Sequence, residues 1–309
     1  MDFNSVMSLL QTALELGLIG SLTVLSLFLS YSMLNVCDLS TDGCFTLGAA
    51  VGGVVAISGH PILAIFAAMG AGMLSGLVVS FLQTKMGIDS LLAGIIVNTA
   101  LYSVNIAVMG SSLLNMNKTE TVFTMMQGWL KGTFLENQYK LVVILIFVTL
   151  AVVFLAVFLR TRLGLAIRAT GDNPAMVKSS SINPVITTII GLCLSNALTG
   201  LSGCLLAQSQ KSVNIDIGSG MVTIALASLL IGNAFFGRGS ITKRAIGAVV
   251  GAFVFRLVYT IALRFNMPAF MLKLVSSVIV IIAIAGPYLR SRLPILQRKL
   301  QLKSGKGDK

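Results

Sequence analysis

Two carboxylates lie close together between two apolar runs, in the stretch Cys37-Asp38-Leu39-Ser40-Thr41-Asp42-Gly43. A polar, non-helical stretch at membrane depth is tolerated where it lines a cavity or is buried in protein. Acids there are usually functional, because an unpaired charge in lipid is costly. Either Asp38, Thr41 and Asp42 line a polar path, or Ser40 or Asp42 caps the helix that follows.

Three polar side chains farther along share one face of an expected helix. Asn98, Tyr102 and Asn105 are spaced at i, i+4 and i+7, which places them on one stripe. Polar side chains on such a stripe either hydrogen-bond a neighbouring helix or line a pathway. Asn98 and Asn105 are therefore candidate path residues, with helix–helix bonding as the other explanation.

Two cations, Arg256 and Lys273, lie inside apolar segments. With a rise of about 1.5 Å per residue, Arg256 lies roughly 12 Å inward from Arg264, and Lys273 lies roughly 8 Å from Pro268. Both side chains have the length to snorkel to the outer interface. Alternatively, they neutralise an anionic group, such as an amino-acid carboxylate, in an outward cavity.

The sequence offers no constellation for catalysis or metal binding. No Ser-His-Asp grouping or paired carboxylates of an enzyme stand out, and the single histidine, His60, has no metal-binding companions. The four cysteines form no CxxC pair and are expected to pack as small apolar residues. The sequence contains no Walker loop, GxxxxGK[ST], so this chain is not expected to hold ATP or another cofactor itself.

The elements that position these residues must lie in a membrane. Only 10% of the 309 residues are charged, against about 25% in a soluble domain. Apolar segments fill the chain from end to end, which predicts one all-α polytopic membrane bundle over residues 1–309. The net charge of +12 lies in short loops and the tail, as in membrane proteins, rather than in a nucleic-acid patch. No positive n-region precedes Lys85, so a cleavable signal peptide is not expected.

About nine membrane-spanning segments of about 20 apolar residues are expected. They lie at roughly 17–36, 46–59, 62–84, 90–110, 139–159, 185–207, 220–236, 245–264 and 267–287, and the second and seventh are short. If the loop 160–184 and the tail 288–309 are cytoplasmic, 15 basic residues lie inside and 5 outside. The C-terminus is then inside, and an odd number of segments places the N-terminus outside.

The two short segments belong to an internal repeat. The stretch from Gly43 to Ala50 can be laid on the stretch from Gly220 to Ala227, so that Thr46 meets Thr223. In each copy a short apolar segment precedes a turn and a long segment with a GxxxG spacing. The copies run in opposite directions, which is typical of transporters, whose short broken helices mark the substrate path. Thr223 is therefore a further candidate path residue.

The loop 160–184 contains a candidate docking element. It includes Arg168-Ala169-Thr170-Gly171-Asp172-Asn173-Pro174-Ala175-Met176-Val177-Lys178. Asn173 is a natural N-cap and Pro174 suits the first helical position, so a short helix is expected to begin there. Such a helix either docks a partner or only connects two segments.

This loop resembles that of the ribose and branched-chain amino-acid permeases of ABC importers, in which "R-A-x-G-x-N-P-x-A" precedes "S-G-I-N". The resemblance continues through Gly191–Gly203 and Gly218–Gly239, and Cys37-Asp38-Leu39-Ser40 is similar to the "I-D-L-S" of the sugar branch. It thus covers nearly the whole chain. Ser181 departs from the pattern, because Gly is common at that position. Amino-acid permeases paired with an external binding protein are closest in character.

The resemblance implies a single permease domain, residues 1–309, in a bacterial cell membrane and without enzyme activity of its own. The loop helix would sit in a cleft of an ABC ATPase subunit, which binds the ATP. The ATPase-coupling residues would be Arg168, Gly171, Asp172, Asn173 and Pro174. An external substrate-binding protein and a second permease subunit, as a homodimer, would complete an importer for a small polar solute, an amino acid before others.

Two alternatives stay open. The same type of importer could carry a sugar or a nucleoside. An ion-coupled secondary transporter also fits an inverted repeat, but it should show a paired acid within the membrane.

Overall fold

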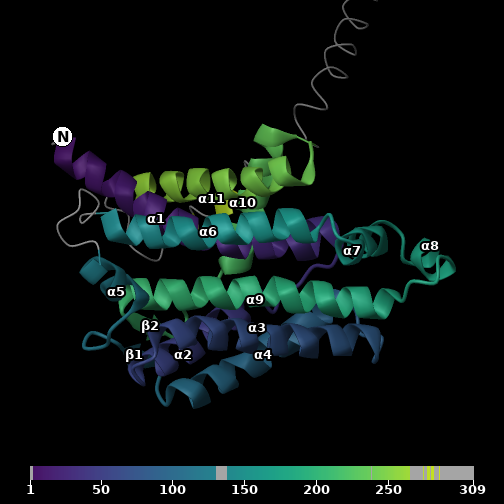
Figure 1. The fold of residues 1–309 in the computed structure, drawn as a ribbon, viewed down its shortest axis with the longest axis horizontal. Coiled ribbons are helices and arrows are strands. Elements are labelled where there is room, and N and C mark those ends of the chain that lie inside the picture. The colour runs from purple at the N-terminus through teal and green to yellow at the C-terminus, as the bar shows by residue number, and fades with distance from the viewer. Residues whose placement is uncertain are drawn as a thin grey trace, which may run out of the picture.

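The computed structural model describes residues 3–129, 138–237 and 239–264, with Leu274, Ser277, Val278, Val280, Ile281 and Ala285 beyond them. Within these residues the chain is a bundle of helices that run side by side along the long axis (Figure 1). The candidate path residue Lys273 and the tail 288–309 lie outside the described residues, as does most of the expected segment 267–287.

The first half of the chain contains α1 (Phe3–Leu27), the π-helix η1 (Phe28–Met33), α2 (Thr41–Ile57), α3 (Pro61–Thr84), α4 (Ser90–Met109), β1 (Leu113–Asn115) and α5 (Val122–Trp129). The second half contains α6 (Tyr139–Phe158), α7 (Arg162–Asp172), α8 (Pro174–Ser179), α9 (Pro184–Gln210), β2 (Ser212–Asn214), α10 (Met221–Phe236) and α11 (Ile241–Arg264).

Among the described residues, six helical stretches are long and apolar enough to cross a membrane. These are Leu10–Met33, Pro61–Thr84, Ser90–Met109, Tyr139–Phe158, Pro184–Gln210 and Ile241–Ala262. Helices α2 and α10, with 17 and 16 residues, are apolar but shorter, as expected for the second and seventh segments. The count of nine segments is not reached within the described residues. The first helix also begins earlier than expected, at Phe3, because residues 5–16 consist mostly of good helix formers.

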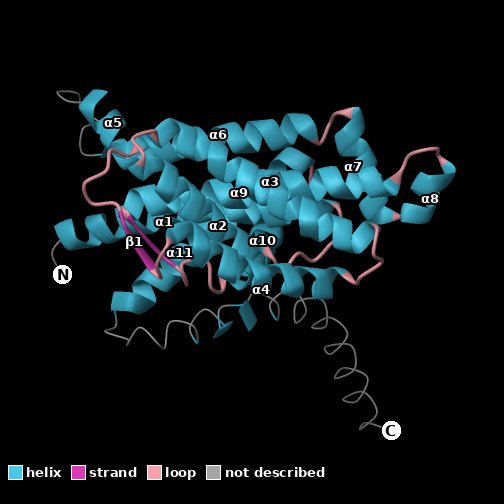
Figure 2. Ribbon diagram, turned by 90° about the horizontal axis from the view of Figure 1, so that it is seen from below, coloured by secondary structure: helices cyan, strands magenta, loops and turns pink. Residues whose placement is uncertain are grey.

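The bundle has two distinct ends. Strands β1 and β2 pair antiparallel, with Leu114 opposite Val213, and lie near α5 at the end where the N-terminus is found (Figures 1 and 2). Helices α7 and α8 lie at the opposite end (Figure 1). The Lys and Arg distribution makes the α7–α8 end the expected cytoplasmic one.

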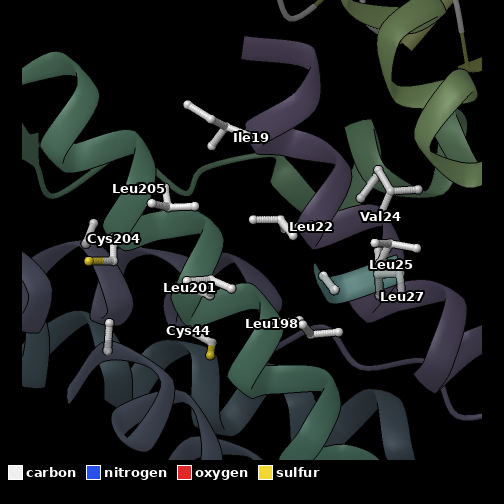
Figure 3. Packing of buried hydrophobic residues seen from close by; sticks show 14 of the residues in the cluster. Ile19, Leu22, Val24, Leu25, Leu27, Cys44, Leu198, Leu201, Cys204 and Leu205 are labelled. Atoms are coloured by element: carbon white, nitrogen blue, oxygen red, sulfur yellow. The ribbon is translucent and has the colours of Figure 1, made fainter. Parts of the chain in front are cut away.

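Glycines let α9 approach both α2 and α3 closely. A Cβ on Gly72 of α3 would collide with the Asn196 carbonyl of α9, and one on Gly48 of α2 would collide with Gly200. Small residues permit such backbone approach inside membranes, where dispersion rather than water exclusion drives helix packing. On its other side α9 packs against α1, and Leu22, Leu198 and other apolar side chains lie between them (Figure 3).

Helix α1 ends in a break that the chain needs in order to turn back into the bundle. Its last turn widens into η1, and Asn35 follows with a positive φ of 56°. Pi-helical turns often occur at functional sites, because they interrupt the regular hydrogen-bond ladder. Residues 34–40, called the η1–α2 break below, then lead to α2.

Candidate functional site

The amino termini of the two short helices meet. The Asp42 carboxylate in the first turn of α2 accepts a hydrogen bond from the Gly220 N–H (2.9 Å) and another from the Val222 N–H (2.8 Å) of α10. Asp42 therefore caps the helix of the other repeat copy. The expectation that Ser40 or Asp42 caps α2 is wrong, because Ser40 makes no cap bond and its hydroxyl donates to Asp38 instead.

Two amides of α4 hold the start of α2. The Gly43 N–H donates to Asn98 Oδ1 (2.7 Å), and Asn105 Nδ2 donates to the Gly43 carbonyl (3.1 Å). The i, i+7 spacing thus serves helix–helix bonding. Since Asn98 is the ninth of the 20 residues of α4, the meeting point of α2 and α10 lies about halfway along the bundle.

Asp38 anchors the η1–α2 break to α9. Its carboxylate accepts hydrogen bonds from the Ser40 N–H (2.8 Å), the Ser40 hydroxyl (2.6 Å) and Asn196 Nδ2 (2.8 Å). The Thr41 hydroxyl donates to the Asp38 carbonyl (3.0 Å). Asp38 and Thr41 are each only 1% exposed, so both residues support the break from within.

A cavity of about 280 Å³, called the polar hollow below, opens beside the meeting point. Its lining comes from α2, α4 and the segment before α10, and consists of Asp42, Gly43, Thr46, Asn98, Thr99, Tyr102, Asn105, Ile215, Asp216 and Ser219. The structure therefore brings together three of the predicted path residues, Asp42, Asn98 and Asn105.

Other predicted path residues lie elsewhere. Thr223 is exposed on α10 and does not line the polar hollow. Arg256 borders a separate, mostly apolar cavity of about 70 Å³ between α1, α10 and α11, where its guanidinium lies 5.0 Å from the centre of the Tyr259 ring. A cation over an aromatic face is a stabilising arrangement, and Arg256 is not among the residues that line the polar hollow.

The residues predicted to contact an ATPase divide into two groups. Asn173 caps α8 as expected, with Oδ1 accepting from the Ala175 and Met176 N–H groups, and it is exposed like Asp172 and Pro174. Gly171 instead faces inward, because a Cβ there would collide with the Met33 carbonyl at the end of η1. Arg168 is half-buried in α7.

One acid of the polar hollow, Asp216, was not predicted from the sequence. It precedes α10, in the segment corresponding to the η1–α2 break that precedes α2. The signal was available, since Asp216 is an acid between apolar runs, the same feature that singled out Asp38 and Asp42. The repeat comparison began at Gly220 and therefore did not include Asp216.

Comparison with known proteins identifies a permease family and relatives that are named as transport permeases. Residues 9–284 match the family described as "Branched-chain amino acid transport system / permease component". The tyrosine transport system permease protein of Clostridioides difficile is 31% identical over 285 residues, 92% of this chain and 93% of that protein. The ribose import permease protein RbsC of Escherichia coli K12 is 27% identical over 224 residues, 70% of this chain and 67% of that protein. No solved structure matches significantly.

Proposed function

The chain belongs to the family of branched-chain amino acid transport permeases, and from that premise we propose that it is the membrane-spanning subunit of an ABC importer. Its cargo is a small polar solute, an amino acid before a sugar or a nucleoside. One relative is named for tyrosine and another for ribose. The amino acid is favoured because the tyrosine-named relative is similar over more of both chains.

The observation that carries this proposal is the polar hollow beside the two short helices. Two half-length helices whose amino termini meet inside the bundle provide polar backbone and side chains where a continuous helix would present only apolar ones. Asp42, Asn98 and Asn105 supply hydrogen-bonding groups there. The solute path therefore runs along α2, α4 and the segment before α10.

A second copy of this chain is proposed to close the path. Tyr102 lines the polar hollow and is 52% exposed, so the hollow opens on the outer face of α4. Ile95 and Leu91 on the same helix are also about half exposed, at 51% and 47%. A homodimer packed on this face would shield the hollow from lipid, and an external binding protein would deliver solute at the α5 end.

Coupling to ATP is assigned to α7 and α8. Helix α8 projects from the bundle end (Figure 1), with Met176 65% exposed and Val177 buried beneath it. An exposed apolar side chain on a capped, projecting helix suits insertion into a cleft of a partner. The partner ATPase binds and hydrolyses the ATP, and Asn173 and Pro174 set the start of the inserted helix.

The test is capture of partners from the native host by the tagged chain. We expect a Walker-motif ATPase to be recovered with the unchanged protein and lost with Met176→Glu, which places a charge in the proposed contact. Trp129→Glu is the matched control, because Trp129 is 86% exposed on α5 at the opposite end. Equal ATPase recovery with both variants would contradict the assignment of α8.

Asp38 supports one alternative, an ion-coupled secondary transporter. It is a buried carboxylate contacting α9 at Asn196, the thirteenth of the 27 residues of that helix. Such an acid is a common device of ion-coupled carriers. Uptake into vesicles that needs internal ATP and persists when ion gradients are collapsed would reject this alternative. Uptake that follows the gradient without ATP would reject the importer.

A further inference from the structure

The charged groups that line the polar hollow are both negative. Asp42 and Asp216 are the acids, and no Lys, Arg or His lies among the described lining residues. Asp216 is exposed, and no described residue donates a side-chain hydrogen bond to its carboxylate. A solute that enters the hollow therefore meets a region that attracts positive charge.

Asn105 adds an acceptor that nothing in the described protein satisfies. The residue is 1% exposed, and its Oδ1 is buried without a hydrogen-bond partner. The amide can take only one orientation. The Gly43 carbonyl accepts a hydrogen bond from Nδ2, and the amide oxygen could not donate one in that position. Since an unsatisfied buried acceptor costs free energy, Oδ1 suits a hydrogen-bond donor from outside the chain.

The polar hollow also contains two neutral hydrogen-bond donors, both on α4. Asn98 uses Oδ1 to accept from the Gly43 N–H, which leaves its Nδ2 as a donor. The Tyr102 hydroxyl is a second one, on the exposed side of α4. Both donors are neutral, so they can bind a carbonyl or carboxylate oxygen but cannot balance the charge of an anionic solute.

We propose that the polar hollow binds the protonated amine of the transported solute, through Asp42, Asp216 and Asn105 Oδ1. The inference rests on the proposed function and deepens it, because it names the recognised group. Amines and zwitterionic amino acids are accepted, whereas solutes with a carboxylate and no amine are rejected.

The test measures binding of three probes to the purified chain in lipid nanodiscs by saturation-transfer NMR. L-Leucine carries both charged groups, 3-methylbutylamine keeps only the amine, and 4-methylpentanoate keeps only the carboxylate. We expect the two amines to bind and the carboxylate to bind at least about fivefold more weakly, since hydrogen bonds to charged groups are worth more than neutral ones.

Asp216→Asn is the informative variant, because it removes one charge from an exposed side chain and leaves the contacts of the helices intact. Amine binding should weaken about fivefold, a modest loss that reflects solvent screening of an exposed pair. Glu120→Gln is the matched control, since Glu120 is an exposed acid outside the hollow, and binding should not change.

Three outcomes overturn the proposal: equal binding of 4-methylpentanoate, amine binding that is unaffected by Asp216→Asn, or no amine binding by the unchanged protein. None of them bears on ATPase capture or ATP-driven uptake. A failure of amine recognition is therefore distinguishable from a failure of the importer assignment.

Discussion

Helices α2 and α10 are the two short helices of the repeat, yet they sit in different surroundings. Twelve of the 17 residues of α2 are buried, against six of the 16 residues of α10. Helix α2 packs against α3, α4 and α9, whereas α10 packs mainly against α11 and α1. Phe235 near the end of α10 is 70% exposed.

The difference indicates that α2 is held rigidly in the bundle, whereas α10 is the short helix that can shift its position more easily. Helix α2 is fixed along its length by backbone contacts with α9, at Gly48 and at Phe45, whose carbonyl lies against Gly203. Near its amino terminus, α10 is bonded to α2 by the Asp42 carboxylate. Packed elements shift by small sliding movements at such boundaries, so we expect α10 and α11 to move against α2 during transport.

The largest effect is expected from Gly48→Ala in α2. The added Cβ would collide with the Gly200 carbonyl of α9, and packing against α3, α4 and α9 leaves α2 less room to move than α10 has. We expect folded protein to be lost, measured as the yield of the monodisperse peak in detergent. Gly70→Ala is the control, because nothing lies within 4 Å of a Cβ at Gly70. A normal yield of Gly48→Ala would refute the close packing of α2.

The same substitution in α10, Gly232→Ala, should cost less. Its Cβ would collide with the Gly247 carbonyl of α11, an overlap similar to that at Gly48. Because α10 has an open side, the two helices can separate slightly, and we expect destabilisation of about 1–3 kcal/mol with folded protein still recovered. The measurement is the thermal unfolding midpoint beside that of Gly70→Ala. A loss as complete as that of Gly48→Ala would remove the distinction between the two helices.

Local sequence patterns were enough to predict several parts of this arrangement. The lengths of the apolar runs predict that α2 and α10 are short, and Asn173 followed by Pro174 predicts α8. The spacing of Asn98 and Asn105 predicts a shared face, because both lie on one regular helix. Each of these features depends on residues within a few turns of one another.

Features that depend on distant contacts could not be predicted in this way. The hydrogen bond between Asp42 and Gly220 joins residues 178 positions apart, and no local sequence pattern predicts that Gly220 is the partner of Asp42. Depth along a helix predicted that Arg256 lies within the membrane, but not which neighbours it faces. It borders the apolar cavity formed with α1 and α10, away from the polar hollow. The inward face of Gly171 likewise depends on η1, which belongs to a remote part of the chain.

The most local effect is expected from Asp42→Ala, which breaks the two hydrogen bonds between the short helices and leaves their other contacts in place. The Gly220 and Val222 N–H groups lose their acceptor, and hydrogen bonds to a charged group are worth about 1.5–3 kcal/mol. Amide exchange of a peptide covering residues 218–224 should therefore speed up about tenfold or more, measured by hydrogen–deuterium mass spectrometry.

Asp42→Asn is the graded control. Its side chain keeps one acceptor oxygen in place of two and carries no charge, so it replaces only part of the hydrogen bonding of the carboxylate. Its exchange should fall between that of Asp42→Ala and the unchanged protein. A peptide covering residues 44–57 should stay protected in both variants, since α2 is held by α9 and α4. Equal acceleration in the two peptides would show that the cap stabilises both helices, and α2 would then not be the fixed support.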